Sequence, residues 1–176
     1  MPMAEGYLRR RIDGVAASRR LRRYAAARFE PAWLALWAVA LTARGAQTPD
    51  AWLLGRSGLS RALLWPGPLG HDAWEHEAPA RAESRLGGEI SEAGRPSPEA
   101  FARWWLWERL ARPRLWPLRV QPATQQRLWL PLWLGYHQGR QTRLIVLSGV
   151  SGEALGALKP AVLAALRAEA RTAMPD

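Results

Sequence analysis

The chain has 176 residues, a length that predicts one domain, or two small halves sharing a core, with enough buried surface to fold without covalent cross-links. It contains no cysteine, which excludes disulfide bonds and thiolate metal sites. The formal net charge is +10, and every basic residue except Lys159 is an arginine, so the composition predicts an anionic partner.

The first 30 residues hold eight arginines and predict a basic amphipathic helix over 5–29, with a break and a new N-cap near Ser18. After the break, apolar residues recur at helical spacing, at Leu21, Tyr24, Ala25 and Phe29. The neighbouring arginines fall on the opposite side of this helix. Such a face either binds anions or is an ordinary solvated surface, and the pattern leaves both alternatives open.

Three further helices are expected before the middle of the chain. Residues 32–44 are apolar almost all round and predict a buried central helix that ends at Gly45. A Thr-Pro-Asp sequence then predicts the start of a third helix over 51–56. Residues 59–65 predict a short fourth helix, which Pro66 ends.

Residues 67–97 form an acidic segment with few large apolar side chains, and we expect a loop or connector there. His71 and His76 lie in it among several carboxylates, which are residue types that bind zinc and other divalent metals. Their spacing matches no ligand pattern, so we expect a solvated acidic loop, with no metal and no cofactor. A further hypothesis is that this loop covers the basic helix until nucleic acid displaces it.

The second half of the chain begins with a helix that starts after Ser97 and ends at Pro113. Three tryptophans within four residues lie in this helix, at Trp104, Trp105 and Trp107. They cover too much of the helix circumference to share one buried face. At least one is therefore expected against a sheet and one at the surface, where it can serve as an interface.

From Arg114 the apolar period changes to two, which predicts strands over 115–120, 127–136 and 143–147. The middle strand is apolar on both faces, so both must be covered, by helices or by a partner. A last helix follows, offset or kinked at Pro160, with its apolar positions at Leu155, Leu158, Val162 and Leu166.

These elements predict an α+β fold, in which an N-terminal helical part is followed by a helix, a three-stranded antiparallel meander and a C-terminal helix. The predicted domain organisation is a helical part over 1–66, an acidic connector over 67–97 and an α+β part over 98–176.

Residues 53–65, LLGRSGLSRALLW, resemble the core of a bacterial helix-turn-helix that extends over 48–65. Gly58 stands where that motif has its turn, and Leu-Ser-Arg opens the next helix. The resemblance implies that Ser60 and Arg61 face the DNA major groove. A plain helical hairpin without DNA contacts is the alternative.

The sequence contains no complete catalytic motif, so we expect a non-enzymatic protein that binds DNA or RNA. The expected phosphate contacts come from Arg9, Arg10, Arg11, Arg19, Arg20, Arg22 and Arg23, and Ser60 and Arg61 are the expected base contacts. Three more arginines are expected to extend the basic surface, namely Arg112, Arg114 and Arg119.

Two other functions remain open from the sequence. One is an adaptor or assembly subunit that uses a tryptophan-rich surface for a protein partner or for a second copy of the chain. The other is peripheral attachment to an anionic membrane through residues 5–29. The longest apolar segment is well short of the about 20 residues of a membrane-spanning helix, and no secretory signal is recognisable, so we expect a cytoplasmic protein.

Overall fold

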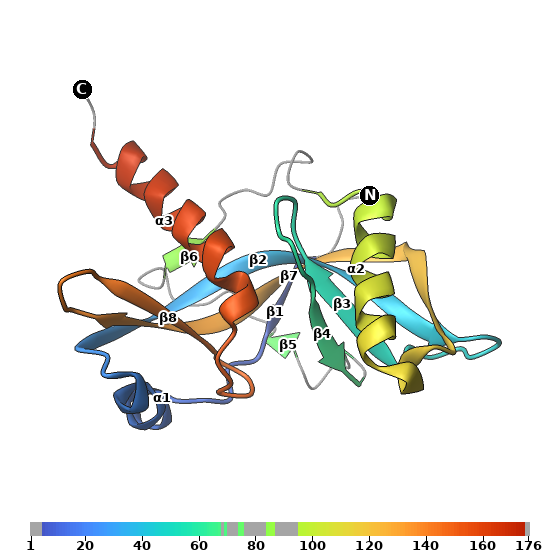
Figure 1. Cartoon of the computed structure of the whole chain (residues 1–176), viewed down its shortest axis with the longest axis horizontal. Helices are drawn as coiled ribbons and strands as arrows, with labels where there is room; N and C mark the ends of the chain where they lie inside the picture. The colour runs from blue at the N-terminus through green and yellow to red at the C-terminus, as the bar shows by residue number, and fades with distance from the viewer. Residues whose placement is uncertain (1–4, 68, 70–73, 76–83, 87–94, 175–176) are drawn as a thin grey trace. The chain divides into compact units, whose positions relative to one another are not determined.

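The computed structural model describes residues 5–67, 69, 74–75, 84–86 and 95–174 (Figure 1). The helices of this part of the chain are α1 (Gly14–Leu21), α2 (Pro98–Ala111) and α3 (Lys159–Thr172), with short 3-10 helices η1 (Arg22–Tyr24), η4 (Pro113–Leu115) and η5 (Gly156–Leu158). Its strands are β1 (Glu5–Leu8), β2 (Arg28–Ala43), β3 (Ala51–Gly55), β4 (Leu63–Pro66), β5 (Trp74–Glu75), β6 (Ser84–Leu86), β7 (Leu118–His137) and β8 (Arg143–Ser148).

The described strands form one mixed sheet in the order β4-β3-β2-β7-β1-β5, with β8 paired to β7 and β6 paired to β2. The β2–β3, β3–β4 and β7–β8 pairs are antiparallel, whereas β6 runs parallel to β2. The predicted α+β fold with a three-stranded meander is therefore wrong, because the N-terminal part contributes strands to the sheet in place of a helical layer.

The chain divides into two compact units that interleave along the sequence. The first unit, called the α2 unit, comprises 1–6, 36–74 and 90–128, and the second, called the α1–α3 unit, comprises 7–35, 75–89 and 129–176. The two longest strands, β2 and β7, each supply residues to both units.

The helix expected over 32–44 is wrong, since these residues form most of β2. Every residue from Ala32 to Leu41 is buried. A continuous apolar run fits a buried helix and a strand covered on both faces equally well, and the many alanines favour the helix when the segment is considered alone. Pairing with β3 and β6 outweighs that local preference.

The helices expected over 51–56 and 59–65 are also wrong, because these residues form the β3–β4 hairpin, in which Leu53 pairs with Leu64. Asp50 does not begin a helix. Its backbone N–H donates to the Leu41 carbonyl at 2.9 Å, and its carboxylate accepts from the Ala43 N–H at 3.2 Å, so it closes the β2–β3 turn.

Only part of the helix expected over 5–29 is formed, because β1 precedes α1 and β2 follows it. The N-cap is Asp13 and not Ser18, and its carboxylate accepts from the Ala16 N–H at 2.8 Å. The helical path ends at Ala25, whose backbone is left-handed (φ 54°).

The expected elements of the second half correspond more closely to the structure. Ser97 caps α2, as predicted, by accepting from the Ala100 N–H at 3.1 Å. The strands expected over 127–136 and 143–147 lie within β7 and β8, although β7 is continuous from Leu118 where a break was expected. In α3, Pro160 lies in the first turn and does not kink the helix interior.

In the α2 unit, α2 lies along β3 (Figure 1). Trp104 is buried, and its indole N–H donates to the Leu59 carbonyl at 3.3 Å. Its ring lies so close to Gly55 that an added Cβ would be 2.7 Å from it. The absence of a side chain at Gly55 is what lets α2 and β3 approach each other.

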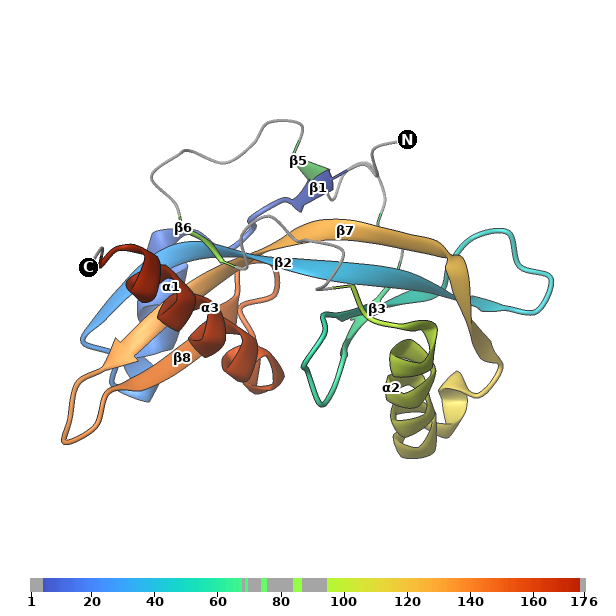
Figure 2. The ribbon, with the colours of Figure 1, turned by 90° about the horizontal axis from the view of Figure 1, so that it is seen from above.

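In the α1–α3 unit, α1 and α3 lie on opposite sides of the β7–β8 hairpin (Figures 1 and 2). Ala17 and Leu21 of α1 pack against Trp133 and Leu147 of the hairpin. On the other side, α3 buries Val162 and Ala165. Among the described elements, α1 thus covers the face of β7 that carries Trp133, and α3 contacts β8 and β6.

Candidate nucleic-acid interface

Four arginines lie close together in the sequence of the α1–α3 unit, at the end of α1 and in η1. We call them the basic helix surface, and they are Arg19 and Arg20 in α1 and Arg22 and Arg23 in η1. All four side chains are exposed. They point to solvent because the opposite side of the helix, with Ala17 and Leu21, is buried against the β7–β8 hairpin. The C-terminal end of a helix also favours positive charge, which stabilises arginines in this last turn.

The side chains of three arginines of the basic helix surface, Arg19, Arg22 and Arg23, have no ion-pair or hydrogen-bond partner among the residues that the structure describes. Arg20 is different, because its guanidinium donates to the Gly152 carbonyl at 3.4 Å. The three remaining guanidinium groups keep their full hydrogen-bonding capacity for an external anion.

An exposed aromatic ring lies at the end of the same surface. Tyr24 follows Arg23 in η1, and its side chain is 47% exposed. The backbone beside it is fixed to β7, because the Ala27 N–H donates to the Tyr136 carbonyl at 2.8 Å and His137 Nδ1 lies 2.8 Å from the Ala25 carbonyl. The exposed tyrosine therefore directly follows the arginines in the chain and directly precedes an anchored segment.

Arg10, an expected phosphate contact, is occupied inside the α1–α3 unit. Its guanidinium lies between the rings of Trp33 and Trp133, at 5.1 and 4.7 Å from their centroids. One of its nitrogens donates to the Leu132 carbonyl at 2.8 Å. These contacts connect β2 to β7 and leave Arg10 a structural role.

The two neighbours of Arg10 are exposed. Arg9 already interacts with another part of the chain. Arg11 offers its side chain to solvent, while its backbone N–H donates to the Gly149 carbonyl at 2.8 Å.

Ser60 and Arg61 belong to the α2 unit, in the loop between β3 and β4, and both are exposed. The helices that the helix-turn-helix resemblance implies are not formed around them. Arg61 lies 3.7 Å from the buried carboxylate of Glu108, whose other oxygen is 3.8 Å from Arg112. Both arginines thus neutralise a buried charge, and they do not share a unit with the basic helix surface.

Arg114 and Arg119 also belong to the α2 unit and are exposed. Arg119 lines a pocket together with Arg44, a residue that the sequence reasoning missed. Arg44 gives no local signal, because it follows an apolar run as a single basic residue and meets Arg119 only through the pairing of distant segments.

A second exposed feature of the α2 unit is apolar. We call it the tryptophan face, and it consists of Leu106, Trp107, Leu110 and Trp116, which are 52–62% exposed. Trp116 is held by its indole N–H, which donates to the Arg109 carbonyl at 2.7 Å. Trp104 and Trp105 are buried while Trp107 is exposed, as the crowding of these three residues predicted.

Two features typical of other protein classes are absent from the described ranges. These residues contain no group of three or more His, Asp or Glu side chains placed to hold a metal ion, while His71 and His76 lie outside the described residues. Among the same residues, no helix combines the length and apolar character needed to cross a membrane.

Comparison with known proteins gives no further guide to the site. No family model matches the chain, and neither a curated protein nor a solved structure matches it.

Proposed function

We propose that the protein binds nucleic acid, DNA or RNA, without catalysing a reaction, through the basic helix surface and Tyr24. The observation that carries this proposal is the group of three arginines whose side chains have no partner within the described residues, Arg19, Arg22 and Arg23, followed in the chain by an exposed aromatic ring that directly precedes an anchored segment. We further propose that it acts in the cytoplasm.

The chemistry of this surface favours a single-stranded segment. Guanidinium groups donate to phosphate oxygens without regard to sequence, and each neutralised phosphate releases counterions. Tyr24 can stack on an unpaired base, an interaction that contributes about 1–3 kcal/mol and that a paired duplex does not permit. In this account Arg10 holds the unit together and contacts no phosphate.

The proposal is tested by removing the three free charges together. Arg19→Gln, Arg22→Gln and Arg23→Gln in one chain should weaken binding of a fluorescent single-stranded oligonucleotide by roughly tenfold or more at moderate salt. The matched control changes three exposed arginines elsewhere, Arg103, Arg167 and Arg171, to Gln and removes the same net charge. Fluorescence anisotropy measures the affinity of each variant for the oligonucleotide. If both variants lose the same affinity, binding depends only on the net charge, and the proposal is contradicted.

The tryptophan face supports a second candidate function, an adaptor or assembly subunit. Exposed tryptophans are typical of the central residues of protein interfaces. If a second copy of the chain is the partner, the molar mass measured by light scattering should rise with protein concentration. Trp107→Ser should then restore the mass of a single chain, and a constant mass in the unchanged protein contradicts self-assembly.

A further inference from the structure

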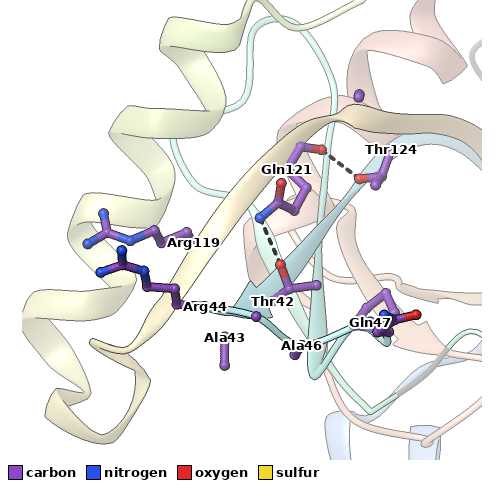
Figure 3. Close-up of a pocket in the computed structure, with 11 residues that line it drawn as sticks. Thr42, Ala43, Arg44, Ala46, Gln47, Arg119, Gln121 and Thr124 are labelled. Atoms are coloured by element: carbon purple, nitrogen blue, oxygen red, sulfur yellow. Dashed lines mark hydrogen bonds between the residues drawn. The ribbon is translucent and has the colours of Figure 1, made fainter.

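The α2 unit contains a polar pocket of about 440 Å³ that the proposed nucleic-acid interface does not use (Figure 3). Its walls come from the end of β2, the turn that follows it and the first part of β7. The lining residues are Thr42, Ala43, Arg44, Gly45, Ala46, Gln47, Pro49, Arg119, Gln121, Ala123 and Thr124. Its size is within the range of small-molecule sites, about 300–1,000 Å³.

The polar side of this pocket is ordered by hydrogen bonds within β7 and between β7 and β2. The Gln121 side-chain amide donates to the Thr42 hydroxyl oxygen at 2.8 Å. The Thr124 hydroxyl donates to the Gln121 carbonyl at 2.6 Å and accepts from the Ala40 N–H at 2.8 Å. Thr42 accepts through its oxygen, and its hydroxyl also carries one donor hydrogen.

Two guanidinium groups lie at one edge of the pocket, where Figure 3 shows Arg44 and Arg119 alongside each other. Neither has an acidic or hydrogen-bond partner within the described part of the chain. The carboxylate of the nearby turn, Asp50, accepts from the Ala43 N–H and does not line the pocket. Two adjacent positive charges without a counter-ion repel each other, and a bound anion would remove that repulsion.

We propose that this pocket binds a phosphate monoester, with its dianionic head between Arg44 and Arg119. Two guanidinium groups balance a charge close to −2 and match its oxygen geometry through paired N–H donors. The Thr42 hydroxyl and the Gln47 amide supply neutral donors for the remainder of the ligand. The pocket is larger than a phosphate ion, which fits a head group that carries an attached organic part.

The phosphate monoester could be free in solution or form the 5′ end of a nucleic-acid strand, and calorimetry on the full chain separates these sources. The probes are adenosine 5′-monophosphate, adenosine, and one oligonucleotide prepared with either a 5′-phosphate or a 5′-hydroxyl. The chain should bind the monophosphate and not adenosine if it takes a free ligand. A preference for the 5′-phosphorylated strand alone would identify a strand end as the ligand.

Arg44→Gln together with Arg119→Gln should weaken binding of the preferred probe at least tenfold. Arg103→Gln together with Arg114→Gln is the matched control, because these exposed arginines of the same unit lie outside the pocket. The pocket proposal is overturned if no phosphorylated probe binds better than its unphosphorylated counterpart, or if both double variants bind equally. Failure of the proposed function is separate, since the Arg19, Arg22 and Arg23 variant should keep the preference for the phosphorylated probe over its unphosphorylated counterpart.

Discussion

At the scale of single residues, the positions of several side chains depend on one or two close contacts. Trp104 is confined on two sides, by its hydrogen bond to the Leu59 carbonyl and by the ring of Phe101, whose centroid lies 5.3 Å away at an angle of 87°. Both contacts oppose a movement of the ring away from Gly55. In the other unit, the Tyr136 hydroxyl donates to the Glu30 carboxylate at 2.6 Å.

Gly55→Ala should lower the free energy of unfolding by about 1–3 kcal/mol, because the new methyl group overlaps the Trp104 ring and one of the two must shift. Chemical denaturation followed by tryptophan fluorescence measures this loss. Gly156→Ala is the matched control, since an added Cβ there meets nothing within 4 Å, and its effect should stay within about 0.5 kcal/mol. If the two substitutions change the free energy of unfolding equally, the contact between residue 55 and Trp104 does not contribute to the loss of stability.

The stability of the protein should fall at alkaline pH because of Tyr136. Burial, followed by the hydrogen bond and negative charge of Glu30, raises the pKa of Tyr136 above its usual value. The folded protein thus holds the phenol proton more tightly than the unfolded chain does. The resulting stabilisation is complete below about pH 10, the usual pKa of tyrosine, and is lost as the pH rises above it.

Tyr136→Phe tests this pH dependence. The variant should be less stable than the unchanged protein at neutral pH by about 1.5–3 kcal/mol, because it loses a hydrogen bond to a charged group. The difference in unfolding free energy between the two proteins should shrink as the pH rises from 9 to 11. A difference that is constant over this range contradicts the assignment.

At the scale of elements, α1 links the fold to the proposed interface. Leu21 is almost fully buried against the β7–β8 hairpin. It fits there because Gly135 has no side chain. A Cβ added at Gly135 would lie only 2.7 Å from Leu21. The docked helix presents Arg19 and Arg20 to solvent, so the position of the arginines depends on this contact.

Leu21→Ala should destabilise the protein by about 2–5 kcal/mol by leaving a cavity beneath α1. It should also weaken oligonucleotide binding, although no charge is removed, because α1 loses its fixed position. Val15→Ala is the control, as Val15 is 69% exposed on the same helix and should change neither property. If a folded Leu21→Ala protein binds the oligonucleotide with unchanged affinity, binding does not depend on the packing of α1 against the β7–β8 hairpin.

The sequence predicts elements correctly where a local signal marks them. α2 begins at Ser97 and Pro98, where the cap and the first-turn proline are followed by a long run of residues that favour a helix, and the alternating residues of β7 and β8 indicate strands. The apolar run of β2 has no period, so its state depends on pairing with distant strands. The same reason hid the pocket, because Arg44 and Arg119 meet only once β2 and β7 are side by side.

At the scale of the whole molecule, the positive charge has several separate uses. Arg10 and Arg61 are engaged within the two units, by tryptophan rings and by the buried Glu108. Arg44 and Arg119 line the pocket of the α2 unit. A net charge of +10 therefore does not by itself define a binding surface. We propose that the basic helix surface, and not the net charge as such, supplies the contacts to nucleic acid.

The salt dependence of oligonucleotide affinity tests that claim most directly. For single strands, each neutralised phosphate contributes about 0.7 to the slope of log affinity against log salt. Replacing Arg19, Arg22 and Arg23 by Gln should therefore make the slope shallower by about 2, while the control with Arg103, Arg167 and Arg171 replaced should keep the slope of the unchanged protein. Identical slopes in all three proteins would contradict the account.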